Sequence, residues 1–175
     1  MSDVVTVRRV AADEVEACVA ALADVLIDCV EGGASVSFMH PLSRVKALAF
    51  WRGVAEGVQH GERALLVAEI DKGQIVGTVQ LILGQPENQP HRADVAKMLV
   101  RRDARRRGIA QRLMEMVDEI ARAEDRTVLV LDTVTGGDAE RLYHRTGWTR
   151  VGDVPDYALM PTGGLSSTTF YYRQL

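Results

Sequence analysis

Six arginines fall within residues 100–113, VRRDARRRGIAQRL, of a chain whose formal net charge is −3. At the centre of this stretch, residues 105–110 (RRRGIA) lead from a short loop into an amphipathic segment. A helix that begins there presents unpaired N–H groups and the positive end of its dipole, which suit a phosphate. Gly108 and Ala110 keep the backbone accessible, and guanidinium groups can bracket the same anion. The pattern favours a polyphosphate cradle, and the alternative is a solvated helix face.

Two carboxylates stand where a predicted strand begins or ends. Asp132 closes the apolar run VLVLD, and Asp94 opens the run DVAKMLV. A carboxylate in apolar surroundings can have a raised pKa and accept a proton directly or through water. The structural alternatives are solvation of a strand start for Asp94 and a cap on nearby backbone amides for Asp132. Asp132 is also a candidate partner for the ammonium group of a substrate.

The composition limits the class of protein. The 175 residues are 47% hydrophobic and 26% charged, which suits one soluble domain over residues 1–175 with a continuous core. The acidic balance argues against a general nucleic-acid binder, and an aromatic content of 5% leaves few rings to stack on bases. The four histidines are scattered without a paired ligand, so no metal site is expected.

The two cysteines and the chain's apolar segments indicate the compartment. Cys18 and Cys29 are eleven residues apart in a predicted helix, which separates them by about 16 Å and excludes a disulfide between them. Residues 17–30 are too short, and too interrupted by acidic residues, to span a bilayer. The first residues lack the basic and apolar regions of a signal peptide. We therefore expect a cytoplasmic protein with no membrane partner.

Hydrophobic periodicity and turn residues predict an α/β or α+β unit in the order β-αα-βββ-α-β-α-ββ. The first helix is expected to be capped by Asp13 with Glu16, the last by Asp138, and Gly147 to end it. The continuously apolar residues 127–133 predict a central strand buried on both faces. The predicted strands cover residues 4–10, 63–70, 75–83, 94–100, 127–133, 148–152 and 167–175. The predicted helices cover residues 13–30 and 43–60, a long segment from 109 and a short segment from 138. A turn at 71–74 is expected to join two strands as a hairpin, and residues 153–166 are expected to form a loop.

Two separated motifs resemble those of the GCN5-related N-acetyltransferase (GNAT) superfamily. Residues 98–114, MLVRRDARRRGIAQRLM, resemble its acetyl-coenzyme A signature, a hydrophobic strand followed by R/Q-x-x-G-x-G/A, here at Arg105, Gly108 and Ala110. Residues 139–148, AERLYHRTGW, resemble its A-x-x-x-Y-x-x-x-G-F/W element, with Tyr143 as the tyrosine. The resemblance implies a mixed central sheet of about seven strands flanked by four helices.

The resemblance also implies how acetyl-coenzyme A is bound. Backbone amides from Arg106 through Arg107, Gly108 and Ile109 to Ala110 hold the pyrophosphate, and the strand edge at Met98, Leu99 and Val100 pairs with the pantetheine arm. The second signature position, usually glycine in the family, carries Arg106 here. This departure puts the close approach of the amide there in question.

Acetyl transfer from a thioester to an amine requires a base for the amine and a proton for the departing thiolate. The resemblance places Tyr143 beside the sulfur as the general acid; the alternative is a tyrosine that only packs. Asp94 or Asp132 is the candidate base. No covalent enzyme intermediate is needed, so a reactive cysteine is not required.

Two variable segments are expected to bind the acceptor, a primary amine of a small molecule. One is EGGASVSFMHP, residues 31–41, and the other is DVPDYALMPTGG, residues 153–164. Several short stretches resemble the tabtoxin-resistance acetyltransferases, which implies a β-lactam amino-acid toxin as one acceptor and toxin resistance as the role. The candidate acceptor-binding residues are Glu31, Ser35, Ser37, Phe38, Asp153, Asp156 and Tyr157.

Two other classes of function compete with acetyl transfer. A coenzyme A-binding sensor without turnover would keep the arginine-glycine loop and would not depend on Tyr143 or the carboxylates. A nucleic-acid binder would lose affinity steeply with salt, and the acidic net charge disfavours it. A homodimer is an additional expectation, because C-terminal strands of such folds often pair between subunits.

Overall fold

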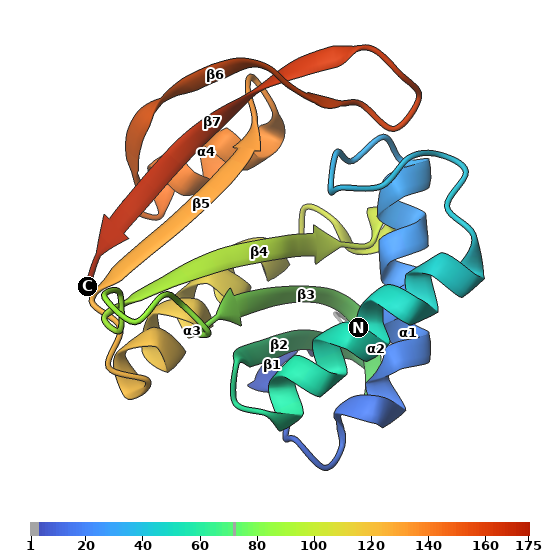
Figure 1. Cartoon of the computed structure of the whole chain (residues 1–175). Coiled ribbons are helices and arrows are strands. Elements are labelled where there is room, and N and C mark those ends of the chain that lie inside the picture. Colours follow the sequence, from blue (N-terminus) through green and yellow to red (C-terminus); the bar gives the residue numbers. More distant parts are fainter. Residues whose placement is uncertain (1–3, 72) are drawn as a thin grey trace.

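A computed structural model describes residues 4–71 and 73–175 of the chain. Within these residues the elements follow the predicted order, with one 3₁₀ turn, η1, added before the third helix (Figure 1). The elements are β1 (Thr6–Arg9), α1 (Val15–Glu31), α2 (Arg44–Gln59), β2 (Arg63–Ile70), β3 (Gln74–Ile82), β4 (Arg92–Val100), η1 (Arg102–Ala104), α3 (Ile109–Ala123), β5 (Val128–Val134), α4 (Asp138–Arg145), β6 (Thr149–Leu159) and β7 (Leu165–Gln174).

The seven strands found in the described residues form one mixed sheet in the order β1-β2-β3-β4-β5-β7-β6. β4 and β5 run parallel, and the other neighbouring strands run antiparallel. β7, the last strand in the sequence, lies between β5 and β6, so the C-terminal hairpin extends the sheet beyond β5 (Figure 1). The predicted hairpin of β2 and β3 is confirmed; of its turn, Lys72 lies outside the described residues.

Alternation along the strands divides the core between the two faces of the sheet. In β2, Leu66 and its neighbours at even positions pack with α3 and α4, whereas Leu65 and Val67 pack with α1 and α2. Successive side chains of a strand point to opposite faces, so one strand supplies both cores. Figure 1 shows α1 and α2 together on one side of the sheet and α3 on the other. The result is a three-layer arrangement with the sheet in the middle.

β4 and β5 separate soon after they meet, and this separation positions the candidate site. β4 pairs with β5 only from Arg92 to Asp94, while its other edge stays paired with β3 as far as Val100. Figure 1 shows the two strands diverging beyond this short contact. A bulge also interrupts the β3–β4 ladder, because Thr78 pairs with Leu99 but Gln80 pairs with Ala96. The extra residue of β4 places Lys97 at a φ of 53°.

The two predicted carboxylate caps are wrong. Glu14 occupies the N-cap of α1 without a side-chain hydrogen bond, and its carboxylate pairs with Arg8 instead. Asp138 is the first helical residue of α4, and Gly137 is the N-cap. A carboxylate located one residue away from the N-cap cannot reach the amides that a cap satisfies. The helices are held by their buried faces rather than by these caps.

The prediction for residues 153–166 as a loop is also wrong, because most of them are strand. β6 continues from Thr149 to Leu159 and pairs with β7, which begins at Leu165. A register shift between Val154 and Ala158 accommodates Pro155 and Asp156, whose φ is 51°. A bulge at a sheet edge tolerates proline, so the proline in this segment is compatible with a strand, although proline by itself is typical of a loop.

The prediction that the strand at 127–133 is buried on both faces is wrong for one face. Leu129 and Leu131 are buried, Val128 and Val130 are half-buried, and Asp132 is exposed. The core under α1 and α2 contains residues of β2, β3 and β4 and none of β5 among the described residues. The helices therefore leave one face of β5 open, next to the site.

Two further predictions concern the cysteines and the membrane. Cys18 and Cys29 both lie on α1, which confirms the predicted helix, and both are free and buried. Of the helices described, none combines the length and the apolar character that crossing a bilayer requires.

Candidate active site

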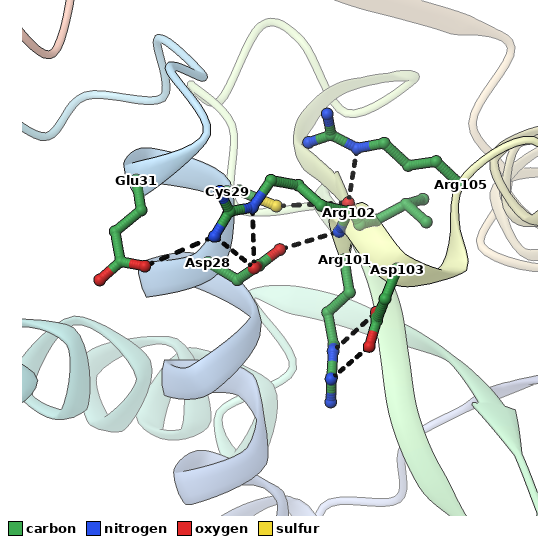
Figure 2. A network of polar contacts seen from close by, with 8 residues as sticks. Asp28, Cys29, Glu31, Arg101, Arg102, Asp103 and Arg105 are labelled. Atoms are coloured by element: carbon green, nitrogen blue, oxygen red, sulfur yellow. Dashed lines mark hydrogen bonds and ion pairs between the residues drawn. The ribbon is translucent and has the colours of Figure 1, made fainter.

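The arginine-rich segment begins where β4 ends, and hydrogen bonds from Arg102 connect its first residues to α1. Arg101 N–H donates to the Val76 carbonyl at 2.8 Å, and the chain then turns through η1. Asp28 of α1 accepts the Arg102 backbone N–H at 2.8 Å and the Arg102 Nε at 2.9 Å. Figure 2 shows the Arg102 guanidinium reaching on to Glu31, at 3.5 Å. The end of α1 and the start of the loop are thereby joined.

The contacts with Arg102 determine the direction in which the pKa of Asp28 is shifted. Burial, which would raise the pKa, is outweighed by the hydrogen bonds from the Arg102 backbone and guanidinium, so the pKa lies below its ordinary value. Glu31, which the sequence suggests for acceptor binding, is placed towards Arg102 rather than towards the diverging strands. Its carboxylate is therefore used to hold the turn.

The other arginines of the segment divide between structural bonds and the exposed loop. Arg101 pairs with Asp103 at 2.7 Å, and Arg112 donates to the Val5 carbonyl at 2.6 Å. The Arg105 Nε donates to the Val100 carbonyl at 3.1 Å, which closes the loop against the end of β4 (Figure 2). Arg106 and Arg107 follow on the exposed surface of the loop. Arginines that bond within the fold therefore stand beside exposed arginines in one segment.

The loop has the backbone geometry of an anion cradle. Gly108 is the N-cap of α3 with a φ of 73°, and Arg106 has a φ of 62°. In the described part of the chain, the amide nitrogens of Arg106, Gly108, Ile109 and Ala110 donate to no acceptor, and the first helical bond is from Arg112 to Gly108. Unpaired amides at a helix start bind anions. The left-handed conformation at Arg106 explains why glycine suits this position, since only glycine adopts it without strain.

The predicted pantetheine edge of β4 is open toward β5. Beyond Asp94, no residue of β4 has a β5 partner in the described ladders. Met98 and Val100 are half-buried, whereas Leu99 packs in the core beneath α1 and α2. The Val100 carbonyl also accepts from the Cys29 thiol at 3.5 Å (Figure 2). An unpaired strand edge can accept an extended ligand with amide groups, as in β-augmentation.

Tyr143 of α4 lies in the core on the α3 side of the sheet. Its ring packs against Trp148 and Tyr171, with centroids 6.0 Å and 5.7 Å away, and the residue is 4% exposed. Within the described residues its hydroxyl has no hydrogen-bond partner, yet it is not among the fully enclosed polar atoms, so the remaining exposure reaches the hydroxyl. Burial and the charges of Asp132 and Tyr171 raise its pKa far above the ordinary value. The phenol is therefore protonated and able to donate.

The structure distinguishes the two candidate bases. Asp94 pairs with Arg92 through Oδ1 and accepts from Gln85 Nε2 through Oδ2 at 3.1 Å. Asp132 accepts one hydrogen bond, from the Thr168 hydroxyl to Oδ2 at 3.0 Å, and is exposed in the second half of β5. Its charge also influences the pKa of Tyr143. Of the two candidates, Asp132 is therefore the carboxylate with an oxygen that has no donor in the described structure.

The two predicted acceptor segments meet in the tertiary structure. His40 N–H donates to the buried Pro161 carbonyl at 2.9 Å, which connects the α1–α2 segment with the β6–β7 turn. Phe38 packs edge-on against Phe50, and Tyr157 packs edge-on against Phe170. Ser35 is half-buried.

Asp153 and Asp156, two other candidate acceptor-binding residues, are both exposed on β6. Asp153 pairs with Arg150 and accepts the Thr169 hydroxyl at 2.7 Å. Asp156 occupies the bulge of β6.

Lys97 belongs to this region and was missed by the sequence reasoning. Its ammonium donates to the Ser37 hydroxyl at 3.0 Å and lies 5.7 Å from the centre of the Phe50 ring. The available signal was a lone cation inside the apolar run DVAKMLV.

No group of metal-ligating side chains occurs among residues 4–71 and 73–175.

Comparisons with known proteins agree with this geometry. Residues 61–150 match the model of the acetyltransferase (GNAT) domain. Over 113 residues, which are 63% of this chain and 65% of the relative, the chain is 35% identical to an uncharacterised N-acetyltransferase of the hisH–hisA intergenic region of Azospirillum brasilense. The chain thus spans slightly less than two thirds of that relative.

Two solved structures share the fold over nearly the whole chain. A ribosomal-protein-alanine N-acetyltransferase from Brucella melitensis has a TM-score of 0.78 at 23% identity, covering 97% of this chain and 99% of that one. The Salmonella typhimurium protein yncA, solved with its cofactor acetyl-CoA, has a TM-score of 0.80 at 20% identity, covering 98% and 94%. The predicted mixed sheet flanked by helices is therefore confirmed.

Proposed function

The chain belongs to the GNAT acetyltransferase family, and we propose that it transfers the acetyl group of acetyl-CoA directly to a primary amine of a small molecule. The observation that carries this proposal is the start of α3, where unpaired amides and two positive φ angles adjoin the open edge of β4. A diphosphate fits the amides, and an amide-containing arm fits the edge. The thioester, when bound, supplies the acetyl group and a thiolate leaving group.

The residues around the diverging strands can supply the proton transfers. Asp132 accepts a proton from the acceptor ammonium, directly or through water, because one of its oxygens has no protein donor in the described structure. The free amine forms the N–C bond as the C–S bond breaks, and the Tyr143 hydroxyl gives its proton to the sulfur. The nitrogen loses its second proton as the amide forms, and this proton restores the phenol, directly or through water. The raised pKa keeps that proton on the phenol until the thiolate develops. Asp94 is left with a structural role by its bonds to Arg92 and Gln85.

The acceptor is expected to bind between the connected α1–α2 and β6–β7 segments, opposite the acetyl donor. Aromatic rings from both segments, Phe38 and Tyr157, supply apolar surface there, and Asp132 supplies a counter-charge for an ammonium. An amino-acid-like amine, including a β-lactam amino-acid toxin, suits such surroundings, and toxin resistance would then be the biological role. The free thiols of Cys18 and Cys29 suit a reducing compartment such as the cytoplasm.

A second copy of the chain is the proposed macromolecular partner. β6 forms one edge of the sheet, and the hairpin exposes several large apolar side chains. An exposed apolar edge strand favours pairing with another strand. Light scattering of the purified chain measures this, and a monomer at micromolar concentration would contradict it. The exposed residues are Val151, Val154, Tyr157, Leu159 and Leu165.

The function is tested by incubating the full chain with acetyl-CoA and a panel of small amines. Thiol release is followed with a chromogenic thiol reagent, and the acetylated amine is identified by mass. Calorimetry with acetyl-CoA runs in parallel. Binding with no acetylated product for any amine would favour a coenzyme A sensor, and no binding by folded protein would overturn the cradle as well.

A further inference from the structure

The Lys97 ammonium contacts the Ser37 hydroxyl and the Phe50 ring, and it forms no ion pair in the described structure. The residue is half-buried, its ammonium has one hydroxyl partner, Ser37, and it lies over one ring, Phe50. None of the described carboxylates lies within ion-pair distance of it. A hydroxyl and a ring face compensate a desolvated ammonium only in part. The position therefore has unused capacity for an anion.

The backbone on both sides of this contact is constrained. Lys97 occupies the bulge of β4 at a φ of 53°, and Ser37 in the α1–α2 segment has a φ of 77°. Non-glycine residues adopt these angles at a cost and keep them where surrounding structure requires it. The bulge turns Lys97 towards α2 and the acceptor segment rather than along the ladder with β3.

Arg63 and Gln80 add two further donor side chains to the neighbourhood of Lys97. Arg63 is near enough to influence Lys97, and its own hydrogen bond is to Gln80, a neutral acceptor, at 2.8 Å. The Gln80 Nε2 is itself buried without an acceptor in the described structure. Burial lowers the pKa of Lys97, the Asp132 charge raises it and Arg63 lowers it, with a lowered value as the result. Arg63 and the Gln80 amide are therefore donors near Lys97 without a carboxylate partner in the described structure.

Leu129 and Leu131 of β5 pack in the core with α3, so the alternation of the strand turns Asp132 to the other face of the sheet, where Lys97 meets Ser37 and Phe50. Lys97 and Asp132 therefore present opposite charges on one face of the sheet, and the described residues include no ion pair between them. The charge of Asp132 also acts to raise the pKa of Lys97. An amino acid carries an ammonium and a carboxylate on neighbouring carbons, so it can satisfy both charges at once. A zwitterion adds no net charge to the site, which favours it over a phosphorylated amine.

We propose that Lys97 binds the carboxylate of the acceptor, with the Ser37 hydroxyl beside it, so that the acceptor is a free amino acid or a close analogue whose amine faces Asp132. This inference rests on the proposed acetyl transfer and narrows it to one class of substrate. Lys97 acts in recognition and takes no part in the proton transfers.

The experiment compares acceptors that differ only at the carboxyl group. Alanine, methionine and phenylalanine are each assayed beside their primary amides, with acetyl-CoA saturating and the full chain as enzyme. The variants are Lys97→Met, which keeps an unbranched apolar side chain, and Lys97→Gln, in case the first fails to fold. Lys46→Met makes the same change at an exposed lysine of α2 and is the matched control. The acid-to-amide ratio is compared between proteins, which cancels the different amine pKa values of acid and amide.

The wild-type chain is expected to prefer the acid. Loss of the ammonium should lower kcat/KM for the acids by roughly 10- to 100-fold, chiefly through KM, because a charged hydrogen bond to the ligand is lost. The amides should change by less than about 3-fold in the same variants, and Lys46→Met should behave as wild type.

Each other outcome overturns the inference. Equal use of acid and amide by the wild type, or equal losses for both in Lys97→Met, removes the carboxylate site while acetyl transfer stands. A mass gain of one acetyl group on Lys97 would make the lysine an acceptor instead. If the wild type acetylates no amine, the proposed function fails, and calorimetry with N-acetylmethionine and coenzyme A decides the site separately. Equal affinity for wild type and Lys97→Met would then refute it.

Discussion

Replacing Tyr143 with phenylalanine removes one oxygen and leaves the ring contacts with Trp148 and Tyr171 in place. Because the hydroxyl has no protein partner in the described structure, the free energy of unfolding should change by less than about 0.5 kcal/mol. The aromatic core and the fold around α4 should therefore be unaffected. A large loss of melting temperature would show that the hydroxyl has a structural bond.

Turnover, in contrast, should fall. General acid catalysis contributes about 10²- to 10⁴-fold. A thiol with a pKa near 8.5 leaves with little help, which places the expected loss at the low end. We expect kcat to fall by roughly 10- to 100-fold, or about 1.4 to 2.7 kcal/mol of transition-state stabilisation. Affinity for acetyl-CoA should change by less than about 3-fold, since the diphosphate amides are unchanged.

The pH dependence gives a second, independent readout. An ordinary tyrosine loses its proton near pH 10. Burial and the Asp132 charge raise the pKa of Tyr143, so the hydroxyl stays protonated throughout the neutral and mildly alkaline range. The ratio of wild-type to variant turnover should therefore be constant from about pH 7 to pH 10. A ratio that collapses within this range would show that the phenol ionises normally and that its environment has been misjudged.

The assay is thiol release at saturating acetyl-CoA, in which the protein's own thiols contribute little. Cys18 and Cys29 are buried, and burial raises the pKa of both. Tyr171→Phe is the matched control, because Tyr171 is fully buried and donates to Glu140 at 2.9 Å. It should lose about 1 to 3 kcal/mol of stability and keep its turnover. Unchanged turnover of Tyr143→Phe, with or without weaker acetyl-CoA binding, would refute the acid role.

Four further predictions concern the carboxylates and the loop. Asp132→Asn should lower kcat roughly 100-fold and Asp94→Asn less than about 5-fold, both by steady-state assay; equal losses would contradict the assignment of the base. Gly108→Ala, with a φ of 73° and no side-chain obstruction, should cost about 1 kcal/mol of stability in thermal unfolding and weaken acetyl-CoA binding in calorimetry. Arg106→Gly should keep or raise stability, and destabilisation would refute strain there. The lowered pKa of Asp28 stabilises the fold above its unfolded value near pH 4, a contribution lost as pH falls through the lower folded value; Asp28→Asn should melt a few degrees lower at neutral pH, a gap that closes in acid.

Local signals allowed the element order and the anion loop to be predicted. Ile109 begins a helix because apolar residues recur from it at helical spacing, and Gly108 precedes it at the position that needs a positive φ. These features depend on residues within a few positions of one another, so the sequence displays them directly. The prediction from neighbouring residues was wrong at residues 153–166. Pro155 and the glycines there indicate a loop, but most of the segment is a strand because it pairs with β7.

The composition of the candidate site depended on contacts between distant residues. Lys97 meets Ser37 across 60 positions, and Arg102 meets Asp28 across 74. Neither pairing has a local pattern, because each depends on the register of β4 and on where α1 ends. Asp94 and Asp132 were equivalent candidates in sequence. Their different surroundings, Arg92 and Gln85 for one and an open edge for the other, separated them.

The sequence by itself determined the family of chemistry: a helix start with exposed amides after an apolar strand, and a tyrosine one helix and one strand further on. Only the tertiary structure shows which carboxylate oxygen has no donor, which arginines bond within the fold, and that Lys97 contacts Ser37 and Phe50. The physical reason is that backbone conformation follows from near neighbours, whereas charge compensation depends on groups that only folding brings together.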